Sequence, residues 1–123
     1  MSAEVDDATN YTPATPLRLA VAAIAGPAWW AIHLGLTYLV VPEACELGIQ
    51  WTLHLITVAM LAATAGTGAM TLGVLRRAGQ HRDRDRYAQR DAYVAWLGMA
   101  MHIFFAAVIV AENLPRWFLD ACW

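Results

Sequence analysis

The sequence predicts an all-α integral membrane protein whose three helices form a bundle. Three uncharged, apolar runs support this prediction, at residues 19–41, 51–75 and 92–111. Each is long enough for a helix to cross a hydrocarbon core of about 30 Å, which requires about 20 residues. Only 15% of the residues are charged and 59% are hydrophobic, whereas a soluble domain is about 25% charged. A β-barrel would need many alternating strands, for which this chain is too short.

The first half of the chain is predicted to form a tail followed by a helical hairpin. Residues 1–16 are polar and contain two prolines, so we expect a disordered tail on the cytoplasmic side. Transmembrane helix 1 is expected at 17–42 and to end at Pro42. The short outer loop at 43–50 predicts that this helix runs antiparallel to transmembrane helix 2, at 51–76.

The distribution of basic residues sets the expected orientation. A charged connection at 77–91 leads to transmembrane helix 3 at 92–114 and an outer tail at 115–123. All eight basic residues are arginines: Arg18, Arg76, Arg77, Arg82, Arg84, Arg86, Arg90 and Arg116. With three spans, all of them except Arg116 fall on the side of the N-terminus. The positive-inside rule makes this side cytoplasmic, so the C-terminus is expected outside. The charged connection is expected to be a solvated helical extension.

The two cysteines, Cys45 and Cys122, fall on the outer side in this topology. Two thiols at one depth in an oxidising compartment predict a disulfide. It would close a long loop and stabilise the fold by on the order of 4 kcal/mol. The alternative is a thiol pair that binds copper or exchanges electrons.

Each apolar run contains one histidine: His33, His54 and His102. Ionisable groups inside a membrane are costly and point to a function. Each histidine lies on a helical stripe with small, hydroxyl or aromatic residues, which is typical of packing surfaces in membrane helices. The residues predicted to pack are Gly26, Trp29, Trp30, Thr57, Thr64, Gly68, Gly98 and Ala106. Trp29 and Trp30 lie far from either interface and should pack against protein or a flat cofactor.

Three interpretations of the histidines remain open, and His33, His102 and His54 are the candidate cofactor-binding residues. They could simply be interhelical hydrogen-bond partners of Thr37, Thr57 or backbone carbonyls. His33 and His102 could ligate a haem b, because their expected depths differ by only about 5 Å. His102 and Met99 could join His33 to bind copper through soft ligands. Quinone binding or proton transfer would be further roles. Near the end of the third helix, Glu112 is expected to form an interfacial ion pair with Arg116, or else a proton entry site.

Several short motifs carry a resemblance to a known group. They are Gly26-Pro27-Ala28-Trp29 with His33, Tyr38 to Pro42 followed by Cys45, Trp51 with His54, and Glu112, Leu114-Pro115 and Cys122. In these motifs, across about residues 26–122, the chain resembles small, poorly characterised bacterial membrane proteins whose genes tend to lie beside those for cytochrome c oxidase subunits and assembly factors. The resemblance implies association with the respiratory chain and no defined chemistry.

The sequence therefore predicts a multi-pass protein of the bacterial inner membrane that is an accessory or assembly subunit of a membrane redox complex, cytochrome c oxidase in particular. Its partners would be lipid and a larger membrane complex or further copies of itself, and not nucleic acid. No nucleophile–base pair, phosphate loop or metalloprotease spacing is found, so we expect no independent enzyme. A haem b-binding electron-transfer anchor and a small oligomeric transporter or channel component are the alternatives.

Overall fold

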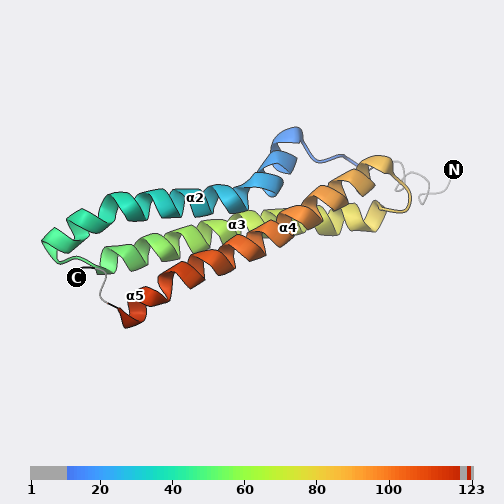
Figure 1. The fold of residues 1–123 in the computed structure, drawn as a ribbon. Coiled ribbons are helices and arrows are strands. Elements are labelled where there is room, and N and C mark those ends of the chain that lie inside the picture. Colours follow the sequence, from blue (N-terminus) through green and yellow to red (C-terminus); the bar gives the residue numbers. More distant parts are fainter. Residues whose placement is uncertain (1–10, 120–121, 123) are drawn as a thin grey trace.

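A computed structural model describes residues 11–119 and 122, and three long helices run side by side through most of it (Figure 1). They are α2 (Pro16–Leu47), α3 (Trp51–His81) and α4 (Arg86–Asn113), and a short helix α5 (Pro115–Phe118) follows α4. Each long helix contacts both of the others, which confirms the three-helix bundle. Each is also long and apolar enough to cross a membrane, and no strand occurs within the described residues.

Helix α2 begins at a capped turn and ends well beyond Pro42, where we expected it to end. The side chain of Thr15 accepts a hydrogen bond from the backbone N–H of Arg18 at 3.3 Å. Pro42 lies inside the helix, because an internal proline removes one backbone hydrogen bond without having to stop the helix. The helix ends at Gly48, whose φ of 69° is the left-handed conformation that glycine favours after a helix. Figure 1 shows α2 bending near its N-terminal end. A further internal proline, Pro27, lies in the N-terminal half of the helix.

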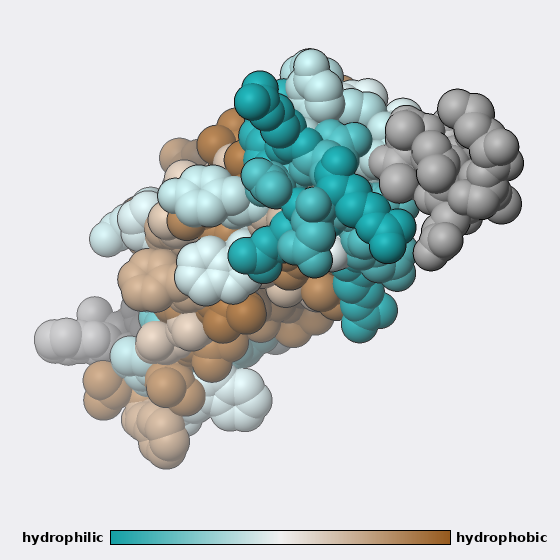
Figure 2. Space-filling model, turned by 90° about the vertical axis from the view of Figure 1, so that its right-hand side faces the viewer, coloured by the Kyte–Doolittle hydropathy of each residue, from teal (hydrophilic) through white to brown (hydrophobic). Residues whose placement is uncertain are grey.

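The end of the bundle that carries the α3–α4 turn, here called the arginine end, is more helical than expected. Within the expected connection at 77–91, α3 continues to His81 and α4 begins at Arg86, which leaves only residues 82–85 outside a helix. Asp85 caps α4 by accepting a hydrogen bond from the N–H of Tyr87 at 2.8 Å. Figure 2 looks onto this end and shows hydrophilic residues gathered there, in front of hydrophobic helix sides.

The expected disordered tail is partly ordered. Residues 1–10 lie outside the described residues, but residues 11–15 pack against the arginine end. The side chain of Tyr11 is buried and belongs to a small apolar cluster with Ala78, Ala88 and Ala92. Its ring centroid lies 5.3 Å from that of His81. Residues 11–15 are therefore held by contacts with α3 and α4. The composition of the tail itself does not reveal these contacts.

Small residues let the three helices approach closely in the interior. The buried positions on α3 include Thr57, Thr64, Gly68 and Thr71, and those on α4 include Ala95, Gly98 and His102. Gly26 of α2 is buried against the backbone of α4, because a Cβ built there would lie 3.1 Å from the carbonyl group of Met101. Of the other predicted packing residues, Trp29, Trp30 and Ala106 are half-buried.

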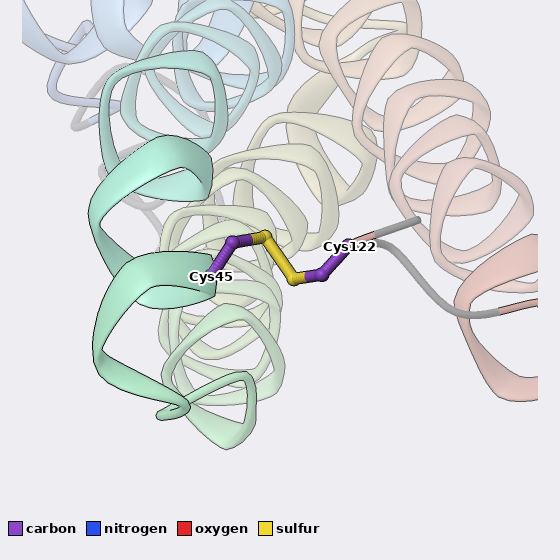
Figure 3. Close-up of a disulfide and its surroundings, with 2 residues drawn as sticks. All are labelled: Cys45 and Cys122. Carbon is purple, nitrogen blue, oxygen red and sulfur yellow. A yellow bond between two sulfur atoms is a disulfide. The ribbon is translucent and has the colours of Figure 1, made fainter.

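At the opposite end, here called the disulfide end, the predicted bridge between Cys45 and Cys122 is present (Figure 3). Cys45 lies in the last turns of α2, and Cys122 lies in the segment that follows α5. Their Cα atoms are 5.4 Å apart, which is an ordinary separation for a disulfide. The bridge joins the end of the first helix to the end of the chain.

Candidate functional site

The most polar part of the interior surrounds His33, toward the disulfide end of the bundle. His33 projects from α2 and is only 1% exposed. Its Nε2 atom lies 3.1 Å from the hydroxyl oxygen of Thr57 on α3. Its Nδ1 atom lies 3.5 Å from a carboxylate oxygen of Glu112 on α4. One imidazole therefore contacts polar groups from both of the other helices.

Glu112 is held from two sides. The indole N–H of Trp30 donates a hydrogen bond to one carboxylate oxygen at 3.0 Å, and the other oxygen faces His33. The carboxylate is half-buried, with 30% of the side chain exposed. The sequence suggested an ion pair between Glu112 and Arg116. Within the described residues, the ion pair of Glu112 is instead with His33. We call His33, Glu112, Trp30 and Thr57 the His33 cluster.

Two tautomers of His33 fit its contacts. The hydroxyl of Thr57 lies 3.1 Å from the carbonyl oxygen of Leu53, to which it can donate. His33 then donates from Nε2 to Thr57, and Nδ1 faces Glu112 with a lone pair. In the other tautomer Thr57 donates to Nε2, and Nδ1 carries the hydrogen that faces Glu112. In either case Nδ1 lies 3.5 Å from the carboxylate oxygen and has no hydrogen-bond partner within the described residues.

A groove of about 470 Å³ opens beside this cluster, between α2 and the end of α4 with α5. We call it the His33 groove. Its lining consists of His33, Leu34, Thr37, Tyr38, Val41, Pro42, Glu112 and Arg116. Three buried polar atoms in this wall have no hydrogen-bond partner: Nδ1 of His33, the hydroxyl oxygen of Thr37 and one terminal guanidinium nitrogen of Arg116. The groove therefore combines unused polar atoms with an apolar wall.

His102 occupies a different environment, deeper in the bundle. Its Nδ1 atom lies 2.6 Å from the carbonyl oxygen of Gly98, to which it must donate, because a carbonyl only accepts. Its Nε2 atom lies 3.0 Å from the hydroxyl of Thr67. Gly68 packs against the ring, since a Cβ there would lie 3.6 Å from it. Both ring nitrogens thus have protein partners, which matches the interpretation of an interhelical hydrogen-bonding residue.

The structure does not bring His33 and His102 to one haem. His33 contacts Thr57 whereas His102 contacts Thr67, and these partners are ten positions apart on α3. At about 1.5 Å per residue the two imidazoles lie roughly 15 Å apart along the bundle. The expected difference in depth was smaller because it took Pro42 and Leu114 to lie at one level, whereas His33 contacts Glu112, only two residues before Leu114. Two axial ligands of one haem iron would have to face each other across a single metal atom.

The remaining candidate residues are also separated from this cluster. His54, in the first turn of α3, stacks edge-on against Trp117 with ring centroids 5.6 Å apart. Met99 lines an apolar groove between α3 and α4 together with His102, away from His33. Among the described residues no group of three or more His, Cys, Asp or Glu side chains is placed to hold a metal ion. The arrangement expected for copper is therefore not assembled.

Sequence reasoning missed Asp91, which is fully buried at the arginine end. Its carboxylate accepts hydrogen bonds from the hydroxyl of Tyr11 at 2.7 Å and from the backbone N–H of Ala14 at 2.9 Å. Arg90 completes the shell with a 3.0 Å ion pair. Burial, and then the neighbouring Asp91 carboxylate, raise the pKa of Tyr11 above its usual range. The helical spacing could have indicated that Asp91 is buried, because Asp91 lies on the buried stripe that continues through Ala95 and Gly98.

Comparison of the chain with protein-family models, with curated proteins and with solved structures finds no match.

Proposed function

We propose that this chain is an accessory or assembly subunit of a larger redox complex in the bacterial inner membrane, a cytochrome c oxidase. The observation that carries the proposal is the outward face of α3. Between residues 59 and 73, exposed small residues recur there at alternating steps of three and four positions: Ala59, Ala62, Gly66, Ala69 and Gly73. We call this surface the α3 outer face.

No contact within the described part of the chain accounts for the glycines of this face. A Cβ built at Gly66 or at Gly73 would meet no atom within 4 Å, unlike one built at Gly26 or Gly98. An exposed glycine inside a helix costs about 1 kcal/mol relative to alanine. Membrane helices associate through small residues that let two backbones approach closely. The α3 outer face is therefore suited to a further transmembrane helix from a partner.

The other lipid-facing surfaces have a different character. The exposed side chains of α2 and α4 are mostly large, and they include Ile24, Leu39, Trp96, Ile103 and Phe104. Large apolar side chains are well solvated by lipid chains, which offer an environment as apolar as their own. The contrast favours α3 for a specific partner, because its run of five small exposed residues is longer than that of α2, which comprises Ala28, Ala31 and Gly35.

Two further arguments concern which complex and which membrane. The choice of a cytochrome c oxidase rests on the resemblance of the motifs around Trp29, His33 and Glu112 to proteins encoded beside oxidase genes. The choice of the inner membrane, with the arginine end in the cytoplasm, rests on the positive-inside rule. A haem-binding anchor is less well supported, because His33 and His102 interact with different layers of the bundle.

Affinity purification from native membranes in a mild detergent tests the proposal. We expect oxidase subunits to be recovered with the tagged wild-type chain. Gly66→Leu should abolish this recovery, because a large side chain would keep the partner helix away. Gly35→Leu is the matched control, since Gly35 is exposed on α2 and a Cβ there also meets no atom within 4 Å. If oxidase subunits never accompany the wild-type chain, the proposal is wrong. Recovery of tagged with untagged copies alone would indicate a homo-oligomer instead.

A further inference from the structure

The His33 groove contains polar atoms whose hydrogen-bonding capacity the protein leaves unused. The side chain of Thr37 is 7% exposed, and its hydroxyl has no partner. This is unusual within the bundle, because Thr64 and Thr71 of α3 each donate to the carbonyl oxygen four residues earlier. A buried hydroxyl without a partner is unfavourable, and natural proteins rarely keep one without a reason.

Arg116 adds a second unused donor to the same wall. One terminal nitrogen of its guanidinium group is buried and has no hydrogen-bond partner. Glu112 supplies an acceptor nearby, and one of its carboxylate oxygens lies 3.5 Å from Nδ1 of His33. The polar end of the groove thus offers two donors and the paired side chains of His33 and Glu112, contributed by α2, α4 and α5.

The rest of the groove is apolar. Leu34, Val41 and Pro42 form its wall, together with the side of Tyr38. Its volume of about 470 Å³ falls within the usual range of about 300–1,000 Å³ for small-molecule sites. The groove faces outward from a membrane-spanning segment, so its ligand would arrive from the lipid phase. A ligand that fits needs an apolar body and a head with hydrogen-bonding oxygens.

The charge in the wall decides which head is favoured. An anionic phosphate head would be attracted to Arg116, but it would be repelled by the carboxylate of Glu112 in the same groove. A neutral head with carbonyl or hydroxyl oxygens meets no such conflict. It can accept hydrogen bonds from Thr37 and Arg116, and in its hydroxyl form it can donate one to Glu112.

We propose that the His33 groove binds the head group of a membrane quinone, with Thr37 and Arg116 as hydrogen-bond donors to its oxygens and Glu112 as the partner of a quinol hydroxyl. The proposal does not depend on the α3 outer face, because the groove lies between α2 and the α4–α5 end. If the chain binds quinone but does not associate with an oxidase, the proposed function fails and the quinone site stands. If it associates with an oxidase but does not bind quinone, the quinone site fails and the proposed function stands.

Photoaffinity labelling tests the site with the full-length protein in nanodiscs of neutral phosphatidylcholine. The probe is an azido derivative of a short-chain ubiquinone, and decylubiquinone is the competitor. We expect peptides containing residues 34–42 and 112–116 to be labelled, and excess decylubiquinone to prevent the labelling. Thr37→Val removes the hydroxyl at nearly constant volume, and Arg116→Gln removes the cation. Each should raise the half-competing concentration of decylubiquinone about tenfold, the effect of one lost hydrogen bond.

Thr71→Val is the matched control, because Thr71 is equally buried but its hydroxyl already donates to the carbonyl oxygen of Thr67. It should leave the competition unchanged. Circular dichroism of each variant establishes that the helices are retained. Labelling spread over the lipid-facing surface, or undiminished by decylubiquinone, would overturn the proposal. It would also be overturned if phosphatidylglycerol nanodiscs abolished the labelling as effectively as decylubiquinone, since the groove would then hold an anionic lipid head.

Discussion

Gly98 of α4 lies directly against the backbone carbonyl group of Ala22 in α2. A Cβ added at Gly98 would collide with the carbonyl oxygen and would lie 2.8 Å from the carbonyl carbon. The obstacle is backbone, which cannot rotate away as a flexible side chain could. The separation of α2 and α4 at this level is therefore set by the absence of a side chain at one position.

Gly98→Ala should destabilise the bundle by about 1–3 kcal/mol, because the added methyl group forces two helix backbones apart. Gly66→Ala makes the same chemical change on the α3 outer face, where the new methyl group meets nothing. It should leave the isolated chain unchanged or stabilise it by up to about 1 kcal/mol through helix propensity. Reversible unfolding in mixed micelles measures both changes. Equal effects of the two substitutions would contradict the packing described here.

The disulfide between Cys45 and Cys122 should hold the last segment of the chain to the end of α2. Because the two cysteines are separated by 77 residues, the chain-entropy model gives a stabilisation on the order of 4 kcal/mol. We therefore expect the double substitution Cys45→Ser and Cys122→Ser to lower the thermal midpoint clearly. Mass spectrometry after alkylation without reductant checks the bond itself. Alkylation of either thiol in freshly isolated membranes would show that the bridge does not form in the cell.

The buried carboxylate of Asp91 should anchor residues 11–15 to the arginine end. Tyr11→Phe keeps the ring in the apolar cluster but removes the hydroxyl that donates to Asp91. We expect the tail to detach more readily, by about 1–3 kcal/mol, since a buried carboxylate loses one of its donors. A nitroxide attached at the exposed position Thr12 reports the change as increased mobility. Tyr87→Phe, at an exposed tyrosine, should have no effect, and equal effects of both substitutions would count against the anchor.

The same anchor should fail in alkaline solution. The pKa of Tyr11 is raised by its burial and by the neighbouring Asp91, so the folded state favours the neutral phenol. A raised pKa means that the contribution to stability is complete below the ordinary tyrosine pKa of about 10 and is lost as the pH rises beyond it. The nitroxide at position 12 should therefore become mobile only above about pH 10. Release near neutral pH would require another titrating group.

Orientation in the membrane is a separate prediction, which follows from the arginines. In spheroplasts a membrane-impermeant maleimide should label Trp51→Cys, at the disulfide end, and should not label Arg84→Cys in the α3–α4 turn. Both positions are exposed, so accessibility within the protein is matched. After lysis both should react. Labelling of Arg84→Cys in intact spheroplasts would reverse the topology and would place the Cys45–Cys122 disulfide in the cytoplasm, where such bonds are rare.

The spans and the disulfide could be predicted because they depend on local composition and on one global rule. Uncharged runs reveal the spans whatever the helices contact, and the two spans between Cys45 and Cys122 return the chain to the same side. The end of α2 was harder, since Pro42 removes only one hydrogen bond whereas Gly48 supplies the conformation that ends the helix.

Thr57 was predicted as a hydrogen-bond partner of the histidines, which the contact with His33 confirms. The rest of the His33 cluster could not be predicted because it depends on how the helices are rotated about their axes. Trp30 and Glu112 are separated by 82 positions in the sequence, and a sequence pattern does not show which faces meet. The sequence favoured Arg116, four residues away on the same helix, as the partner of Glu112. The structure instead directs Glu112 across to α2. Asp91 was missed for a related reason. The expected connection at 77–91 contains five arginines, and a carboxylate in such a segment suggests a solvated position.

Photo-crosslinking from the α3 outer face in native membranes tests the central claim most directly. A photoreactive amino acid replaces Gly66, and in the control chain it replaces Gly35 on the lipid-facing side of α2, each in otherwise wild-type protein. The account predicts a discrete crosslink from position 66 to one transmembrane subunit of a cytochrome c oxidase, and only lipid adducts from position 35. Lipid adducts alone from both positions, or crosslinks exclusively to other copies of this chain, would contradict it.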